Sequence, residues 1–145
     1  SPCPVLYMAA SLRTCLWEMF GDEMFQNERV VAASRWDGCC ASRLLVPELR
    51  VCALSMEKTR SVMGVDKASL LTGDLKVAQG WGLAVQNHPK GFEALKYTSR
   101  FVDQPCLALF DRDGISKRIK VTKLGPLNEL DEAADWLEDQ QVALV

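Results

Sequence analysis

Residues 6–18 read LYMAASLRTCLWE, and this stretch predicts an apolar strand that runs directly into a helix. Ser11 stands at the junction, where its hydroxyl can accept a backbone N–H from the first helical turn. The helix is predicted because apolar residues recur at i, i+3, i+4, i+7 and i+8, the spacing of one buried stripe. The residues of this stripe are Leu12, Cys15, Leu16, Met19 and Phe20.

Glu18 is the one acidic residue in this stretch. At about 100° per residue, it falls on the flank of the apolar stripe, beside Ser11 and Thr14. A carboxylate in that position can face a cleft, or it can be an ordinary solvated residue of a surface helix. Periodicity alone leaves both interpretations open.

The length and composition predict one globular domain. The chain has 145 residues, of which 48% are hydrophobic and 25% charged, enough to bury a sizeable core. The net charge is −2, and no basic block is present, which argues against nucleic acid as the main partner. No apolar run approaches the roughly 18 residues that a bilayer requires. We therefore expect a cytoplasmic protein without a membrane partner.

The six cysteines do not predict a metal site. They include no C-x-x-C pair, and only one histidine, His88, is available to join them. Tetrahedral zinc sites use ligands paired at close spacing. Most of these cysteines stand within apolar runs, where a thiol behaves as a small hydrophobic side chain. We expect no metal and no bound cofactor.

The remaining elements do not alternate strictly between strand and helix, which favours an α+β fold over a doubly wound parallel sheet. The segment 21–38 is predicted to be a loop, and Asp113-Gly114 is predicted to turn a hairpin. Helices are predicted over 75–87 and 128–137. Strands are predicted over 4–8, 92–97, 106–110, 115–121 and 141–145. Residues 42–46 and 49–54 are predicted to form two strands, or one strand broken by Pro47. The strand 4–8 begins so soon after residue 1 that a preceding segment is expected to be missing.

Common catalytic motifs are absent from the sequence. It has no phosphate loop, no G-x-G-x-x-G fingerprint and no G-x-S-x-G elbow. A serine triad would have to recruit His88, which the sequence places at the end of a helix, just before a proline. The candidates that remain are Tyr7 at one strand end, Glu18 on the adjoining helix and Ser99 at another strand end.

Several separated motifs resemble the RES domain family. They are YMAAS (7–11) followed by Glu18, GFEALKYTSR (91–100) and CLALF (106–110). The likeness extends to SRW (34–36), VPELR (46–50) and the terminal VALV (142–145), so we expect one RES-like domain over residues 1–145. The family is named for an arginine, a glutamate and a serine. It is best known for toxins of bacterial toxin–antitoxin pairs that destroy NAD.

The resemblance implies a role for each of the three candidates. Glu18 matches the family glutamate, Ser99 the family serine, and Tyr7 the tyrosine of the family's Y-x-A motif. The family arginine lies upstream of that motif, whereas the first arginine in this sequence is Arg13. Arg35 has a similar R-W context but follows Tyr7, so it is not assigned that role.

The chemistry that the resemblance implies is cleavage of the nicotinamide–ribose bond by water or by phosphate. Glu18 would stabilise the positive charge that develops on the sugar. Tyr7 would stack on nicotinamide, Ser99 would hydrogen-bond to the ribose or the leaving group, and the family arginine would hold the pyrophosphate. The alternatives are a core position for Tyr7 and a purely strand-ending role for Ser99.

Two other functions stay open. One is transfer of ADP-ribose to a protein, and the other is a non-catalytic binding domain. The resemblance also implies a fold with curved, split sheets like that of ADP-ribosyltransferases, and a cognate antitoxin protein as partner. The sequence shows no interface of its own, so homo-oligomerisation is open as well.

Overall fold

A computed structural model describes residues 3–54 and 82–145. The chain divides into two compact units, each assembled from two separate stretches of sequence. The first unit holds Ser1–Ala10 and Val46–Ile119, and the second holds Ser11–Leu45 and Lys120–Val145.

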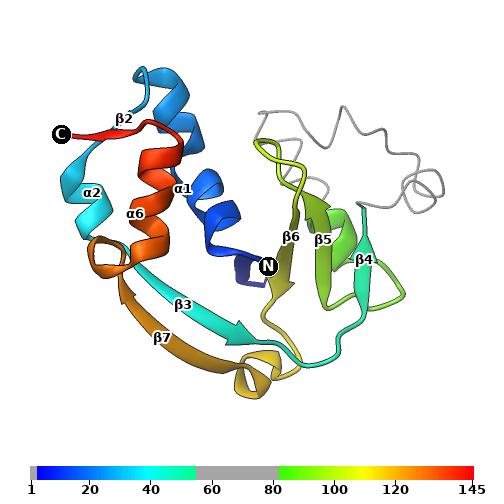
Figure 1. Cartoon of the computed structure of the whole chain (residues 1–145). Coiled ribbons are helices and arrows are strands. Elements are labelled where there is room, and N and C mark those ends of the chain that lie inside the picture. The colour runs from blue at the N-terminus through cyan, green and yellow to red at the C-terminus, as the bar shows by residue number, and fades with distance from the viewer. Residues whose placement is uncertain (1–2, 55–81) are drawn as a thin grey trace. The chain divides into compact units, whose positions relative to one another are not determined.

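The first unit is built on a four-stranded sheet with the order β1-β6-β5-β4. Figure 1 labels β6, β5 and β4 of this sheet. Both β1 and β5 run antiparallel to β6, so they run in the same direction as each other, and β4 is parallel to β5. The carboxyl ends of β1 and β5 therefore lie at the same edge of the sheet. The strands are β1 (Val5–Ala9), β4 (Val51–Ala53), β5 (Ala94–Thr98) and β6 (Pro105–Phe110).

The core of the first unit forms on both faces of this sheet. The central strand β6 alternates its side chains between the faces, which explains why it is apolar along nearly its whole length. One face packs Ala108 and Phe110 against Val85, whereas the other packs Leu109 against Ile115. Ile115 comes from the short 3-10 helix η1 (Ile115–Arg118).

The second unit packs helix α1 (Leu12–Gln26) against helix α6 (Asp131–Asp139). Ser11 caps α1, since its Oγ accepts the backbone N–H of Thr14 at 3.1 Å. The core is aromatic: the Trp17 and Trp136 rings meet edge to face, with their centroids 5.5 Å apart, and Trp36 stacks on Trp136 at 6.2 Å. The helix α6 has Asp131 and Glu132 in its first turn, where negative charge is favoured.

Short strands and turns complete the second unit. The strand β8 (Ala143–Leu144) pairs in parallel with β2 (Val30–Val31), and β3 (Cys40–Leu45) pairs antiparallel with β7 (Lys120–Pro126). The remaining elements are the helix α2 (Ala33–Asp37) and the 3-10 helix η2 (Leu127–Glu129).

The predicted α+β class with small split sheets is confirmed. The opening strand, the helix after it and the Ser11 cap are also confirmed. The loop prediction for 21–38 is wrong, because this segment holds the end of α1 together with β2 and α2. Buried Met24 and Trp36 explain the difference, since they supply apolar anchors within an otherwise polar stretch.

The predicted hairpin at Asp113-Gly114 is wrong as well. Both residues have positive φ, 54° and 71°, as a tight hairpin turn requires. However, both neighbouring positions of β6 are taken by β1 and β5, so the following chain cannot pair with it. It forms η1 instead, and the next strand, β7, pairs with β3.

The C-terminal helix and strand are confirmed as α6 and β8. Of the helix predicted over 75–87, only the last part lies within the described residues, and residues 82–86 are helical there. Single-domain organisation over residues 1–145 stays a prediction. Within the described ranges, no helix combines the length and the apolar character that a membrane crossing needs.

Candidate active site

Tyr7 lies in the middle of β1, opposite Ala108 of β6. Its side chain is 68% exposed. The alternative that Tyr7 is a core aromatic residue is therefore wrong. An exposed ring on a rigid strand is available for stacking against a flat ligand.

Ser99 directly follows β5 and is almost completely buried, with 3% exposure. Its backbone N–H donates to the Gln104 carbonyl at 2.9 Å. Its Oγ accepts the backbone N–H groups of Phe101 at 3.2 Å and of Val102 at 3.4 Å. These two bonds use the acceptor positions of the hydroxyl, and its hydrogen is what it can still offer as a donor.

Tyr7 and Ser99 belong to the same sheet, but they are not adjacent in it. Tyr7 is level with Leu95, because both pair with Ala108 of the intervening strand β6. Ser99 stands four positions beyond Leu95, which corresponds to about 13 Å along β5 and about 10 Å across two strand spacings. The region of the sheet between the two residues is therefore long enough for a ligand that contains several rings.

Glu18 lies on α1 in the second unit and is half-buried. Its position agrees with the predicted flank of the helix. Thr14, one turn earlier, is buried and hydrogen-bonds through its Oγ1 to the Ser11 hydroxyl at 2.9 Å. Tyr7 and Ser99 belong to the first unit, and the participation of Glu18 in a site with them stays a prediction.

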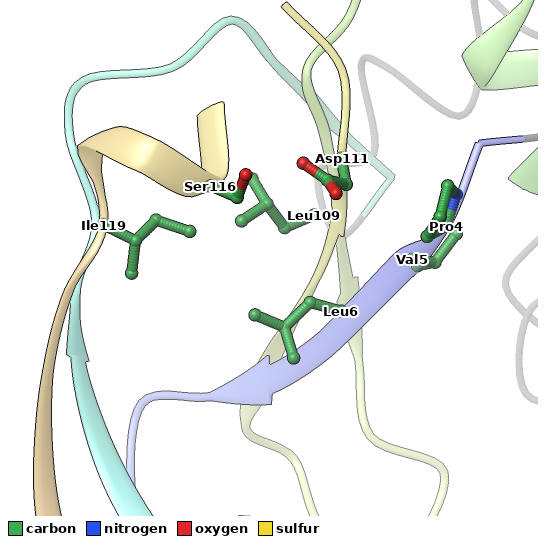
Figure 2. Close-up of a pocket in the computed structure, with 7 residues that line it drawn as sticks. All are labelled: Pro4, Val5, Leu6, Leu109, Asp111, Ser116 and Ile119. Carbon is green, nitrogen blue, oxygen red and sulfur yellow. The ribbon is translucent and has the colours of Figure 1, made fainter. Parts of the chain in front are cut away.

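An open hollow of about 170 Å³ lies at the amino end of β1 (Figure 2). Tyr7, Glu18 and Ser99 do not line it. The strand β1 contributes the Leu6 side chain, which alternates with Tyr7 and points to the other face of the sheet. The hollow is therefore distinct from the region between Tyr7 and Ser99. Its lining residues are Pro4, Val5, Leu6, Leu109, Asp111, Ser116 and Ile119.

His88 has a structural role in a turn. Its Nδ1 accepts the backbone N–H of Lys90 at 3.2 Å, and its ring lies 5.2 Å from that of Phe92. Among the described residues, no three His, Cys, Asp or Glu side chains come together as a metal ion would require, and the absence of a metal site stays a prediction.

Arg100 is a residue beside the site that the sequence reasoning did not single out. It follows Ser99 directly, is exposed, and has its guanidinium carbon 4.3 Å from the centroid of the Phe101 ring. The signal was present in the sequence, because Arg100 ends the motif that contains Ser99.

Comparison with known protein families assigns the chain to one family. The model of the RES domain matches residues 1–129 of the 145. The chain belongs to the RES domain family. The match includes Tyr7, Glu18 and Ser99, and it ends before the terminal segment 142–145. No curated protein gave a significant match.

Proposed function

We propose that this RES domain degrades NAD by cleaving the bond between nicotinamide and ribose. The family match carries the proposal, because it spans the tyrosine, the glutamate and the serine of the family motifs in their family order. Tyr7, Glu18 and Ser99 are the residues that we propose to perform the reaction.

In the proposed reaction, the bond between C1′ of the ribose and the pyridinium nitrogen breaks. The electron pair goes to that nitrogen and leaves nicotinamide neutral, while the sugar becomes an oxocarbenium ion. A fixed carboxylate stabilises this cation, which is the role proposed for Glu18. Water then bonds to C1′ and releases a proton to give ADP-ribose, or phosphate bonds there to give ADP-ribose 1″-phosphate.

The proposed roles of Tyr7 and Ser99 follow from their exposure and bonding. The exposed Tyr7 ring can stack on nicotinamide. The Ser99 oxygen is fixed by two backbone N–H groups, so its hydrogen is held in a limited set of directions. That hydrogen can be donated to a ribose hydroxyl or to the leaving group.

The first experiment incubates the purified chain with NAD, with and without phosphate, and separates the products by chromatography. We expect nicotinamide in both samples. ADP-ribose alone would indicate hydrolysis, and ADP-ribose 1″-phosphate in the phosphate sample would indicate phosphorolysis. Label from NAD that stays on protein would instead support ADP-ribosyl transfer. NAD that remains intact would overturn the proposal for this polypeptide.

The second experiment tests Glu18. We expect Glu18→Gln to lower kcat by at least about 100-fold, as the removal of one electrostatic transition-state contact does. Glu138→Gln is the matched control, since Glu138 is an exposed helical glutamate of the same unit. Equal activity of Glu18→Gln and the native chain would remove Glu18 from the mechanism.

The third experiment addresses the antitoxin. The chain is expressed in bacteria with and without a co-expressed cognate antitoxin, and growth and NAD content are measured. We expect expression of the chain to arrest growth and the antitoxin to restore it. If the chain does not consume NAD, the alternative of a non-catalytic RES domain is favoured.

A further inference from the structure

We propose that the free edge of strand β7 binds an extended, acidic segment of a partner protein. The segment adds as a third strand to the β3–β7 ribbon, which is the antiparallel pair of β3 (Cys40–Leu45) and β7 (Lys120–Pro126) in the second unit. This inference goes beyond the proposed NAD chemistry and does not depend on it.

The outer edge of β7 is unpaired. The ribbon has two strands, so β7 pairs with β3 on one side only. Within residues 3–54 and 82–145, the backbone of residues 120–124 makes no hydrogen bond except to β3. All five of these residues are exposed. An unpaired edge offers a row of N–H and C=O groups to another strand, and a two-stranded ribbon gains stability from a third one.

The charge of the ribbon indicates which kind of strand fits. The ribbon contains Arg43, Lys120 and Lys123 and no acidic residue, although the whole chain has a net charge of −2. Lysines keep a free edge from pairing with a second copy, because like charges would then meet across the new strand pair. The same lysines attract an acidic strand. Charge therefore favours a different, acidic chain over a second copy of this one.

The two faces of the ribbon favour strand addition over a flat ligand. Directly paired residues share a face, so Lys120 lies with Leu45 on one face, and Lys123 lies with Ser42 on the other. Val121 is on the face of Lys123, and both faces therefore hold a large exposed apolar side chain, since Leu45 is 64% and Val121 58% exposed. A membrane surface requires one apolar face and a nucleic acid one basic face, and each face here is mixed. An added strand meets both faces at once, because its side chains alternate.

The chemistry of the segment follows from the spacing of the two lysines. Lys120 and Lys123 are three positions apart and lie on opposite faces, so two acidic residues with the same spacing can pair with both. Branched residues between them suit a strand and can cover Val121. In strand addition, the main-chain hydrogen bonds supply affinity and the alternate side chains supply specificity.

The test uses two capped peptides. TVEVTEVT has two glutamates three positions apart, and TVKVTKVT is its matched control. Each is titrated into the isotope-labelled chain and followed by NMR. We expect the acidic peptide to bind at least about 10-fold more tightly, because two cross-strand charge pairs change from attractive to repulsive in the control. Saturation with the acidic peptide should also slow hydrogen exchange of the outward-facing amides of β7, since they become hydrogen-bonded.

Two double variants test the charges. Lys120→Glu with Lys123→Glu should reverse the preference between the two peptides, and Lys120→Gln with Lys123→Gln should abolish it. The control, Lys90→Glu with Lys96→Glu, makes the same change of charge at exposed residues of the first unit and should keep the native preference. Thermal melting verifies that each variant is folded, and the glutamine variant decides if the glutamate variant is not.

The contrary outcomes are distinct. Failure of the acidic peptide to bind, equal binding of both peptides, or unchanged exchange of the β7 amides in the saturated chain would each overturn the proposal. Tighter, lysine-dependent binding of duplex DNA or of phosphatidylglycerol vesicles would overturn it in favour of those ligands. Protection of the same amides by self-association of the free chain would overturn it in favour of a second copy. NAD consumption tests the proposed function alone, since every outcome here is read from binding.

Discussion

Replacing Ser99 by alanine tests whether this residue holds the turn after β5. The variant removes the acceptor for the N–H groups of Phe101 and Val102, which lie 3.2 and 3.4 Å from the Ser99 oxygen. A hydrogen bond between neutral groups contributes about 0.5–1.5 kcal/mol net. Both bonds are rather long, and Phe101 and Val102 are only half-buried, so water can replace part of the loss. We therefore expect a loss of about 1–2 kcal/mol in the free energy of unfolding.

Two measurements verify this value. Urea denaturation of the whole chain reports the global loss, and native-state hydrogen exchange reports the local one. The amides of Phe101 and Val102 should exchange about 5- to 30-fold faster in Ser99→Ala, the factor that corresponds to about 1–2 kcal/mol.

The matched control is Ser116→Ala, because Ser116 is an exposed serine of the same unit. It should change the free energy of unfolding by less than about 0.5 kcal/mol. Unchanged exchange at Phe101 and Val102 in Ser99→Ala would refute the structural role of this hydroxyl. A catalytic role of Ser99 is measured separately, as a fall in NAD turnover by Ser99→Ala at a temperature where this variant is fully folded.

Three further predictions concern stability. Trp136→Ala should lower the free energy of unfolding by about 3–5 kcal/mol, because Trp136 is fully buried between two other tryptophan rings. Urea denaturation measures this loss. A loss below about 1 kcal/mol would contradict the proposed core. Gly114→Ala should cost about 1–2 kcal/mol in thermal unfolding because Gly114 has a φ of +71°, and Gly114→Asn should cost less, since asparagine tolerates that conformation better; equal costs would argue against backbone strain. Burial raises the pKa of the Cys52 thiol, and the nearby Lys90 charge only partly opposes this, so the folded state holds that proton more tightly. The contribution of this thiol to the free energy of unfolding should be fully present below the ordinary thiol pKa and fall as the pH rises through the raised value. Cys52→Ala should flatten this part of a plot of the urea midpoint against pH. An unchanged plot would refute the assignment.

Local signals in the sequence predicted local structure well. The opening strand and helix follow from apolar spacing and from the Ser11 cap, all within about two turns of each other. Asp113 and Gly114 also adopt the positive φ angles that aspartate tolerates and glycine adopts readily. The pairing of the next strand was not predictable in the same way, because β7 pairs with β3, which is distant in sequence. Whether β6 had a free edge depended on β1 and β5 together.

The candidate site shows the same limit. Motif resemblance identified Tyr7 and Ser99, and the structure adds what the sequence could not predict: the exposure of the Tyr7 ring and the turn that the Ser99 hydroxyl holds. For Glu18, helical periodicity predicts a flank position and nothing about which cavity that flank faces.

The division of each unit between distant stretches of sequence bears on how the protein is made. The core of the second unit joins Leu16 to Trp136, which are 120 positions apart. A ribosome adds roughly 5–20 residues per second, so Leu16 is synthesised roughly 6–24 s before its aromatic partner Trp136. Until Trp136 has been made, Leu16, Phe20 and Met24 lack their final packing, and exposed apolar surface of this kind is prone to aggregate during synthesis.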